Sequence, residues 1–280
     1  MLMIENARRI VRTTSFYMVV IVLFAFMAAP IVWIAATSVQ PYINLTDVPP
    51  RFRVSDITFG AYRKLFEDVN FLKSLRNTVI VTSASSLLTI VLASMSAFAV
   101  SFFRFRGKSA ILFMMTSLQM APAIALLIPL FMLLRSFSLI DTYLGTILVM
   151  SLFITPLAVW MLKSYYQKIP IELLEAARID GCSRLGAMVR IVLPLGGTGI
   201  FATFIFCFIT SWNELLIPLT VSMTKTTTLT MYASALGGMY EVNYAGAAAV
   251  SVLSSIPTVA LALLFRNYLV QGLLEGAVKG

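Results

Sequence analysis

Residues 163–195 read KSYYQKIPIELLEAARIDGCSRLGAMVRIVLPL, and the rest of the chain is organised around this stretch. It is a polar interruption between two hydrophobic runs, since no charge occurs between Asp141 and Lys163 or between Arg190 and Glu214. Its own charged residues include Glu172, Glu175, Arg178, Asp180, Arg184 and Arg190. Such an element predicts either a docking surface for another protein or an interfacial helix packed on its own bundle.

The composition of this stretch predicts two helices joined by a turn. Pro170 suits the first turn of a helix, and residues 171–180 are good helix formers. One face of this helix has helical spacing and consists of Leu173, Ala176, Ala177 and Asp180. Gly181 can adopt a left-handed conformation and turn the chain. A second amphipathic helix follows, marked by Leu185, Met188, Val189 and Val192, and Pro194 is expected to end it.

The composition of the whole chain indicates a membrane protein. Of its 280 residues, 59% are hydrophobic and only 12% are charged, whereas a soluble domain has about a quarter charged residues. The mean hydropathy is +0.91. With two cysteines and no histidine, the chain excludes a Cys/His metal site and catalysis by a histidine base.

Uncharged runs predict six membrane-spanning helices, because an ionised side chain at mid-bilayer is costly and about 20 apolar residues cross the core. The first run is too long for the apolar part of a signal peptide. The sequence therefore predicts an all-α membrane protein with one domain over residues 1–280. Its spans are expected near residues 15–38, 77–103, 110–134, 142–162, 197–221 and 243–265.

The distribution of charge predicts the orientation. With the N-terminus inside, the cytoplasmic segments hold 13 basic and five acidic residues, and the outer segments hold eight basic and seven acidic residues. The positive-inside rule then places both termini and residues 163–195 in the cytoplasm. Residues 39–76 and 222–242 are outside, the former as a loop followed by an amphipathic helix. The net charge of +9 thus reflects topology and indicates no nucleic-acid partner.

Two further features of the sequence bear on function. Gly107-Lys108-Ser109 resembles the end of a phosphate loop, but Phe102 stands where that motif needs a glycine and no strand precedes it. We therefore expect that this chain binds no ATP and no other cofactor. Polar residues inside the predicted spans are candidates for a substrate pathway or for hydrogen bonds between helices, namely Gln119, Trp212, Asn213 and Glu214. Pro122 and Pro129 are expected to kink the helix that carries Gln119.

Segment 163–195 resembles a motif of a known family. Glu175-Ala176-Ala177, then Gly181, Ile191 and Leu193-Pro194, have the spacing of the EAA loop of ABC-importer permeases. The stretch IPIELLEAARIDG resembles the version in carbohydrate permeases of the maltose-transporter type. Further agreement comes from TFGAYRKLF at 58–66, SWNELLIPL at 211–219 and RNYLVQGLLEGAVKG at 266–280.

The resemblance implies a type I importer permease fold in a bacterial cytoplasmic (inner) membrane, with a cytoplasmic coupling helix. It implies four kinds of partner: a second homologous permease, two ATPase subunits that hold ATP and Mg, an extracytoplasmic solute-binding protein, and lipid. Glu175 would make a polar contact to the ATPase, and Gly181 would form the turn that presents it. Ala176, Ala177, Asp180 and Leu185 would complete the coupling surface.

The resemblance to the smaller permease subunit also favours a heterodimer and a sugar or oligosaccharide as substrate. The loop 222–242 would reach the docked solute-binding protein, and the C-terminal tail would lie near the ATPase. Alternatives are an importer of glycerol phosphate, a polyamine or an opine, an ATP-independent secondary transporter, and a membrane scaffold without transport.

Overall fold

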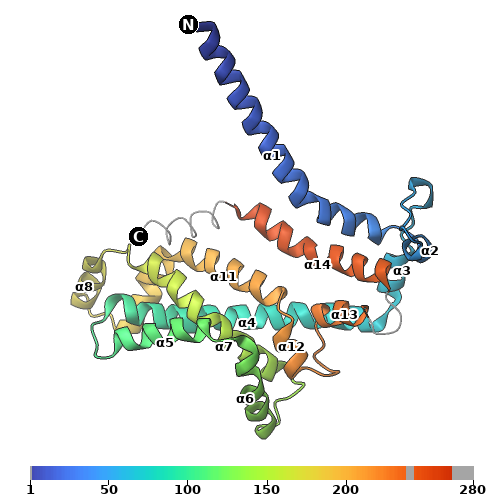
Figure 1. The fold of residues 1–280 in the computed structure, drawn as a ribbon. Helices are drawn as coiled ribbons and strands as arrows, with labels where there is room; N and C mark the ends of the chain where they lie inside the picture. The colour runs from blue at the N-terminus through green and yellow to red at the C-terminus, as the bar shows by residue number, and fades with distance from the viewer. Residues whose placement is uncertain (1, 238–242, 267–280) are drawn as a thin grey trace. The chain divides into compact units, whose positions relative to one another are not determined.

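The computed structural model describes residues 2–237 and 243–266, and this part of the chain contains helices but no strand (Figure 1). It forms two units, residues 1–68 with 233–254 and residues 69–232 with 255–280. The helices of the first unit are α1 (Leu2–Ser38), α2 (Tyr42–Thr46), η1 (Val54–Asp56) and α3 (Gly60–Glu67). Those of the second are α4 (Val69–Phe102), α5 (Lys108–Met120), α6 (Ala123–Ser136), α7 (Tyr143–Tyr166), α8 (Ile171–Ile179), α9 (Arg184–Ala187), η2 (Met188–Val192), α10 (Leu193–Leu195), α11 (Gly197–Trp212) and α12 (Leu216–Val221). Across the unit boundaries run α13 (Leu229–Ala235) and α14 (Tyr244–Leu264).

Within residues 2–237 and 243–266, four helices are long and apolar enough to cross a membrane, and the number rises to six if each of two bent helix pairs is one span. The four are Thr13–Ser38 within α1, α4, α7 and α14. The bent pairs are α5 with α6, and the helical run 184–195 with α11. Five of the six predicted spans fall on one of these elements, whereas the predicted span 197–221 runs past the end of α11 at Trp212 and includes α12.

The Thr13–Ser38 part of helix α1 carries no charged residue on any side, and none of its most hydrophobic stretch is buried within the chain. A helix of this kind is stable in water only when another surface covers it. Lipid or a second subunit must therefore cover α1.

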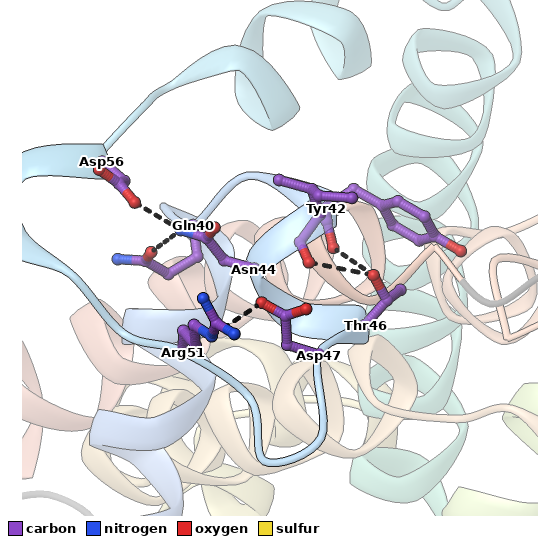
Figure 2. A network of polar contacts seen from close by, with 8 residues as sticks. Gln40, Tyr42, Asn44, Thr46, Asp47, Arg51 and Asp56 are labelled. Atoms are coloured by element: carbon purple, nitrogen blue, oxygen red, sulfur yellow. Dashed lines mark hydrogen bonds and ion pairs between the residues drawn. The ribbon is translucent and has the colours of Figure 1, made fainter.

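A compact polar network follows α1, in the segment where the sequence predicted a loop. Figure 2 shows Asn44, whose amide nitrogen donates to Asp56 Oδ2 at 2.8 Å and to Gln40 Oε1 at 3.3 Å. Gln40 Nε2 donates to the carbonyl of Arg53 at 3.1 Å, and Arg51 pairs with Asp47 at 3.1 Å. The three prolines of this segment do not keep it extended, because these side chains fold it back on itself. The predicted amphipathic helix is present as α3.

The core of the second unit is formed by α4, α7 and α11, which pack side by side. Helix α4 buries a row of small polar residues, including Ser74, Thr78, Thr82, Ser85, Ser86 and Thr89. Small side chains let helix backbones approach closely inside a membrane, where hydroxyl groups can also bridge helices. Ser151 Oγ of α7 donates to the carbonyl of Ser85 at 3.2 Å, and Ser85 Oγ donates to Ser211 Oγ of α11 at 3.3 Å.

Gly199 sets the distance between α11 and α7. A Cβ added at Gly199 would lie 2.3 Å from Cγ of Tyr165, whereas one added at Gly197 would meet nothing within 4 Å. We expect Gly199→Ala to lower the free energy of unfolding by about 1–3 kcal/mol. The new methyl group would clash with Cβ and Cγ of Tyr165, and these atoms cannot move away unless α7 moves too. Thermal unfolding in detergent measures this. Gly197→Ala is the matched control on the same helix, and an equal loss in both variants would contradict this packing role.

The two bends have identifiable causes. Helix α5 ends at Met120 and α6 begins after Pro122, at an angle of 103° (Figure 1). Proline lacks an N–H donor and disfavours helical geometry in the preceding residue, so the predicted break at Pro122 is present, while Pro129 lies inside α6.

The second bend corrects a prediction. Pro194 was expected to separate the second cytoplasmic helix from the next span, but helical backbone continues through it and the 79° bend lies at Gly196. The wide π-turn η2 comes directly before Pro194. Its i→i+5 hydrogen bonding relaxes the tight α-helical turn that a proline ring would clash with.

Candidate functional site

Segment 163–195 folds as two helices joined by a sharp turn. Helix α8 ends at Ile179, and Gly181 adopts a φ of +82°, as the sequence predicted. Cys182 N donates to the carbonyl of Ala177 at 2.8 Å, and Gly181 N donates to that of Arg178 at 3.1 Å. These two bonds form a Schellman motif, which closes a helix end with a left-handed residue.

The second helical run starts immediately after this turn. Ser183 caps it, since its hydroxyl oxygen accepts a hydrogen bond from Gly186 N at 3.0 Å. The Schellman motif includes Cys182, and the cap of the next helix is Ser183, so no residue lies between the two helix ends. The turn at Gly181 is therefore a tight corner held by hydrogen bonds on both sides.

The two alanines of the coupling motif lie on different faces. Ala177 is buried with Leu174, and the side chains of Met188 and Val192 belong to the same hydrophobic cluster as Leu174. Ala176 is exposed. The prediction that Ala176 and Ala177 share one docking face is therefore wrong. Ala177 is buried in the chain's own core, because α8 packs on α9 with Leu174 on its inner face.

The exposed surface of the turn is larger than the sequence indicated. Besides Ala176, it includes Leu173, Asp180, Gly181 and Leu185. Ile179 joins them with 87% of its surface exposed. Ile179 was missed because it lies off the expected helical stripe, although a large apolar residue two positions before a turn glycine was a usable signal.

Glu175 lies at the mouth of a cavity between α8, α9 and the end of α4. The cavity has a volume of about 410 Å³ and is lined by Phe98, Phe102, Phe103, Arg104, Ile171, Leu174, Glu175, Arg178, Arg184 and Ala187. The guanidinium of Arg184 lies over the ring of Phe103, 5.0 Å from its centroid. Among the described residues Glu175 takes part in none of the ion pairs. Its carboxylate is thus exposed and available to a partner.

The four candidate pathway residues do not form one site. Gln119 is exposed and is the one polar side chain lining a cavity of about 690 Å³, which the other ten lining residues make apolar. Trp212, Asn213 and Glu214 do not line it. Trp212 is buried and stacks on Phe208, with ring centroids 5.8 Å apart.

Hydrogen bonding gives two of these residues a structural role. Asn213 Nδ2 donates to the carbonyl of Ile209 at 2.8 Å, at the end of α11. Glu214 Oε1 accepts from the backbone N–H groups of Leu216 at 2.9 Å and Ile217 at 3.3 Å. Glu214 thereby caps the start of α12. Both sets of hydrogen bonds are local in the chain, so they give this pair a structural role but are not the hydrogen bonds between helices that the sequence offered as the alternative.

Sequence reasoning missed a second polar centre, at Asp141 between α6 and α7. Its carboxylate accepts hydrogen bonds from four consecutive backbone N–H groups of residues 223–226, at 2.9–3.2 Å. The hydroxyl groups of Thr224 and Thr226 also donate to it. Burial raises the pKa of Asp141, but these backbone hydrogen bonds lower it by more, so that the pKa lies well below its ordinary value of 3.8. Sequence reasoning missed Asp141 because it directly precedes the predicted span 142–162, where a charged residue is expected and suggests no special role.

This lowered pKa predicts an acid-dependent contribution to stability. The contribution is fully present above the ordinary pKa of 3.8 and is lost as the pH falls through the lowered folded-state pKa. We expect Asp141→Asn to unfold at a lower temperature than the wild type near neutral pH, with the difference shrinking below pH 3.8. Thermal unfolding of both proteins across this range measures it. A difference that grows on acidification would contradict the assignment.

Comparison with known proteins places the chain in a family. The model of the family "binding-protein-dependent transport system inner membrane component" matches residues 85–275, which include the coupling turn and Asp141. The diacetylchitobiose uptake system permease protein DasC of Streptomyces coelicolor is 31% identical, over 93% of this chain and 95% of its own. The trehalose transport system permease protein SugB of Mycobacterium tuberculosis is 32% identical, over 90% and 92%. The trehalose/maltose transport system permease protein MalG of Thermococcus litoralis is 34% identical, over 80% and 82%.

A solved structure supports the fold. The crystal structure of a bacterial ABC transporter involved in the import of the polysaccharide alginate contains a chain that matches with a TM-score of 0.76 and 22% identity, covering 90% of this chain and 94% of that one. The all-helical importer-permease fold predicted from the EAA spacing is therefore confirmed. The chain belongs to the family of binding-protein-dependent transport system inner membrane components, the permeases of ABC importers.

Proposed function

We propose that this chain is one permease subunit of an ATP-driven importer that carries a sugar or oligosaccharide across the bacterial cytoplasmic membrane. The observation that carries the proposal is the similarity, over four fifths or more of the chain, to three permeases named for diacetylchitobiose, trehalose, and trehalose with maltose. The chain itself has no catalytic role in this proposal. ATP and Mg are bound by two partner ATPase subunits.

The coupling surface supports the way in which these ATPases would act. The corner at Gly181 presents Glu175, Ala176, Ile179, Asp180 and Leu185 to a cytoplasmic partner. Behind the corner, Leu174, Met188 and Val192 share one buried cluster with Phe98 of α4 and Leu162 of α7. A displacement of the corner therefore moves the packed ends of two core helices with it, because close-packed side chains transmit strain.

The proposed assembly gives the exposed apolar surfaces and the outer loops their partners. A second, homologous permease subunit would cover apolar surface such as that of α1, and lipid would cover the rest. A solute-binding protein would dock on the outer loops, and both termini would face the cytoplasm. The predicted contact of the C-terminal tail with the ATPase concerns residues 267–280, which lie outside the described residues, as do residues 238–242 of the outer loop.

Purification and reconstitution test the proposal. The chain is expected to co-purify from its native membrane with an ATPase and a second permease. In proteoliposomes the complex is expected to take up the solute only with ATP and the solute-binding protein. Binding measurements on that protein then separate a sugar from glycerol phosphate, a polyamine or an opine. Uptake by the chain alone without ATP, or purification without an ATPase, would overturn the proposal.

A further inference from the structure

Asp141 joins two outer loops through its backbone and its side chain together. Its own N–H donates to the carbonyl of Val221 at 2.8 Å, at the last residue of α12. Its carboxylate then accepts the N–H groups of residues 223–226, which directly follow that helix. Asp141 has a φ of +55°. Aspartate and asparagine tolerate this conformation better than other residues with a Cβ atom, so the position suits a carboxylate.

Helix α4 holds the same loop from a second direction. Asn77 Nδ2 donates to the carbonyls of Lys225 and Thr227, both at 2.9 Å, and Lys73 Nζ donates to the carbonyl of Thr224 at 2.9 Å. Tyr143, two residues after Asp141, donates its hydroxyl to Asn77 Oδ1 at 2.6 Å. We call Asp141, Asn77 and Lys73 the outer latch. In this latch Asp141 accepts hydrogen bonds from the backbone N–H groups of the loop, and Asn77 and Lys73 donate hydrogen bonds to its backbone carbonyls.

The latch leaves part of the loop exposed to a partner. Met223, Thr224 and Lys225 are exposed although their backbone groups are bonded. Thr226 and Thr228 are buried, and the hydroxyl of Thr226 donates to Asp141 Oδ1 at 3.1 Å. Loops of this length usually have freely moving backbones that must be ordered when a partner binds. Ordering the loop beforehand removes that cost and strengthens docking. Four consecutive N–H groups on one carboxylate exceed what a simple helix cap requires, since a cap satisfies one or two.

We propose that Asp141 is a positioning residue that holds loop 222–228 in the conformation on which the extracytoplasmic solute-binding protein docks. This rests on the proposed function, in which the loop faces that protein. The carboxylate does not touch the solute or the partner. It acts through the backbone of residues 223–226, so it should govern the docking affinity more than the rate of transport once docking is saturated.

Titration of the reconstituted transporter tests the proposal. ATP hydrolysis by the complete complex in proteoliposomes is measured against the concentration of its solute-binding protein. We expect Asp141→Asn to raise the half-saturating concentration about 5- to 10-fold, because one of the two acceptor oxygens is replaced by a donor. The maximal rate is expected to fall less than twofold.

Asparagine has nearly the same size as aspartate and tolerates the positive φ of position 141, so this substitution changes only the acceptor oxygens and the charge. Asp47→Asn removes another outer carboxylate, outside the latch, and is expected to behave as wild type.

Hydrogen exchange separates the possible outcomes. In the complete complex without solute-binding protein, Asp141→Asn should speed exchange of the amides of residues 223–226 roughly tenfold and leave the amides of α7 unchanged. Unchanged exchange in the loop, or faster exchange with an unaltered half-saturating concentration, would overturn the proposal. So would a loss of maximal rate as large as the loss of affinity, which indicates a general structural role. If the wild type itself shows no stimulation by a solute-binding protein, the proposed function fails, and exchange still decides whether Asp141 holds the loop.

Discussion

Gly181→Val is expected to lower ATP-driven uptake about tenfold or more while the protein remains folded in the membrane. Gly181 has a φ of +82°, and a Cβ added there would meet nothing within 4 Å. The penalty is therefore one of backbone strain alone, about 2 kcal/mol for a residue with a Cβ atom and more for a β-branched one. A penalty of this size lowers the population of the native turn roughly 30-fold. Because the corner is the proposed contact with the ATPase, transport should fall with it.

Two controls isolate this effect. Gly107 also has a positive φ, of +88°, with nothing within 4 Å of an added Cβ, and it lies in a turn outside segment 163–195. Gly107→Val therefore imposes a similar strain elsewhere and should leave most of the uptake intact. Gly181→Asn tolerates the left-handed conformation and should retain more activity than the valine variant. Uptake assays in proteoliposomes measure all three. Equal losses at both glycines would show that strain, not coupling, is responsible.

Glu175→Lys is expected to have the second large effect, through loss of ATPase binding. The carboxylate is exposed at the cavity mouth and makes none of the ion pairs found among the described residues. In the proposed complex it is satisfied by the ATPase. Truncating one partner of such a desolvated contact costs about 2–5 kcal/mol, and reversing its charge adds repulsion. We expect the affinity for the ATPase to fall by at least about 30-fold.

Glu172 provides the matched control, because it is a second exposed carboxylate on the same helix. Glu172→Lys changes the net charge identically and should leave ATPase binding within a few-fold of wild type. Affinity is measured by titrating purified ATPase against the permease pair in nanodiscs. If Glu175→Lys assembled normally and retained uptake, the assignment of Glu175 to the ATPase contact would be wrong.

The sequence alone was sufficient for the family, the helical fold class and the corner at Gly181. These features depend on local chemistry: uncharged runs reflect the cost of burying charge in lipid, and a turn glycine reflects the backbone itself. The spacing from Glu175 to Pro194 identified the family for the same reason, since a coupling turn is contiguous in the chain.

Only the tertiary structure decided which side chains face inward and which distant segments meet. Ala177 shares a sequence motif with Ala176 but is buried, because the packing of α8 on η2 sets the inner face. Asp141 binds residues more than 80 positions away. No periodicity encodes that contact, since its partners are backbone N–H groups, which every residue type except proline carries.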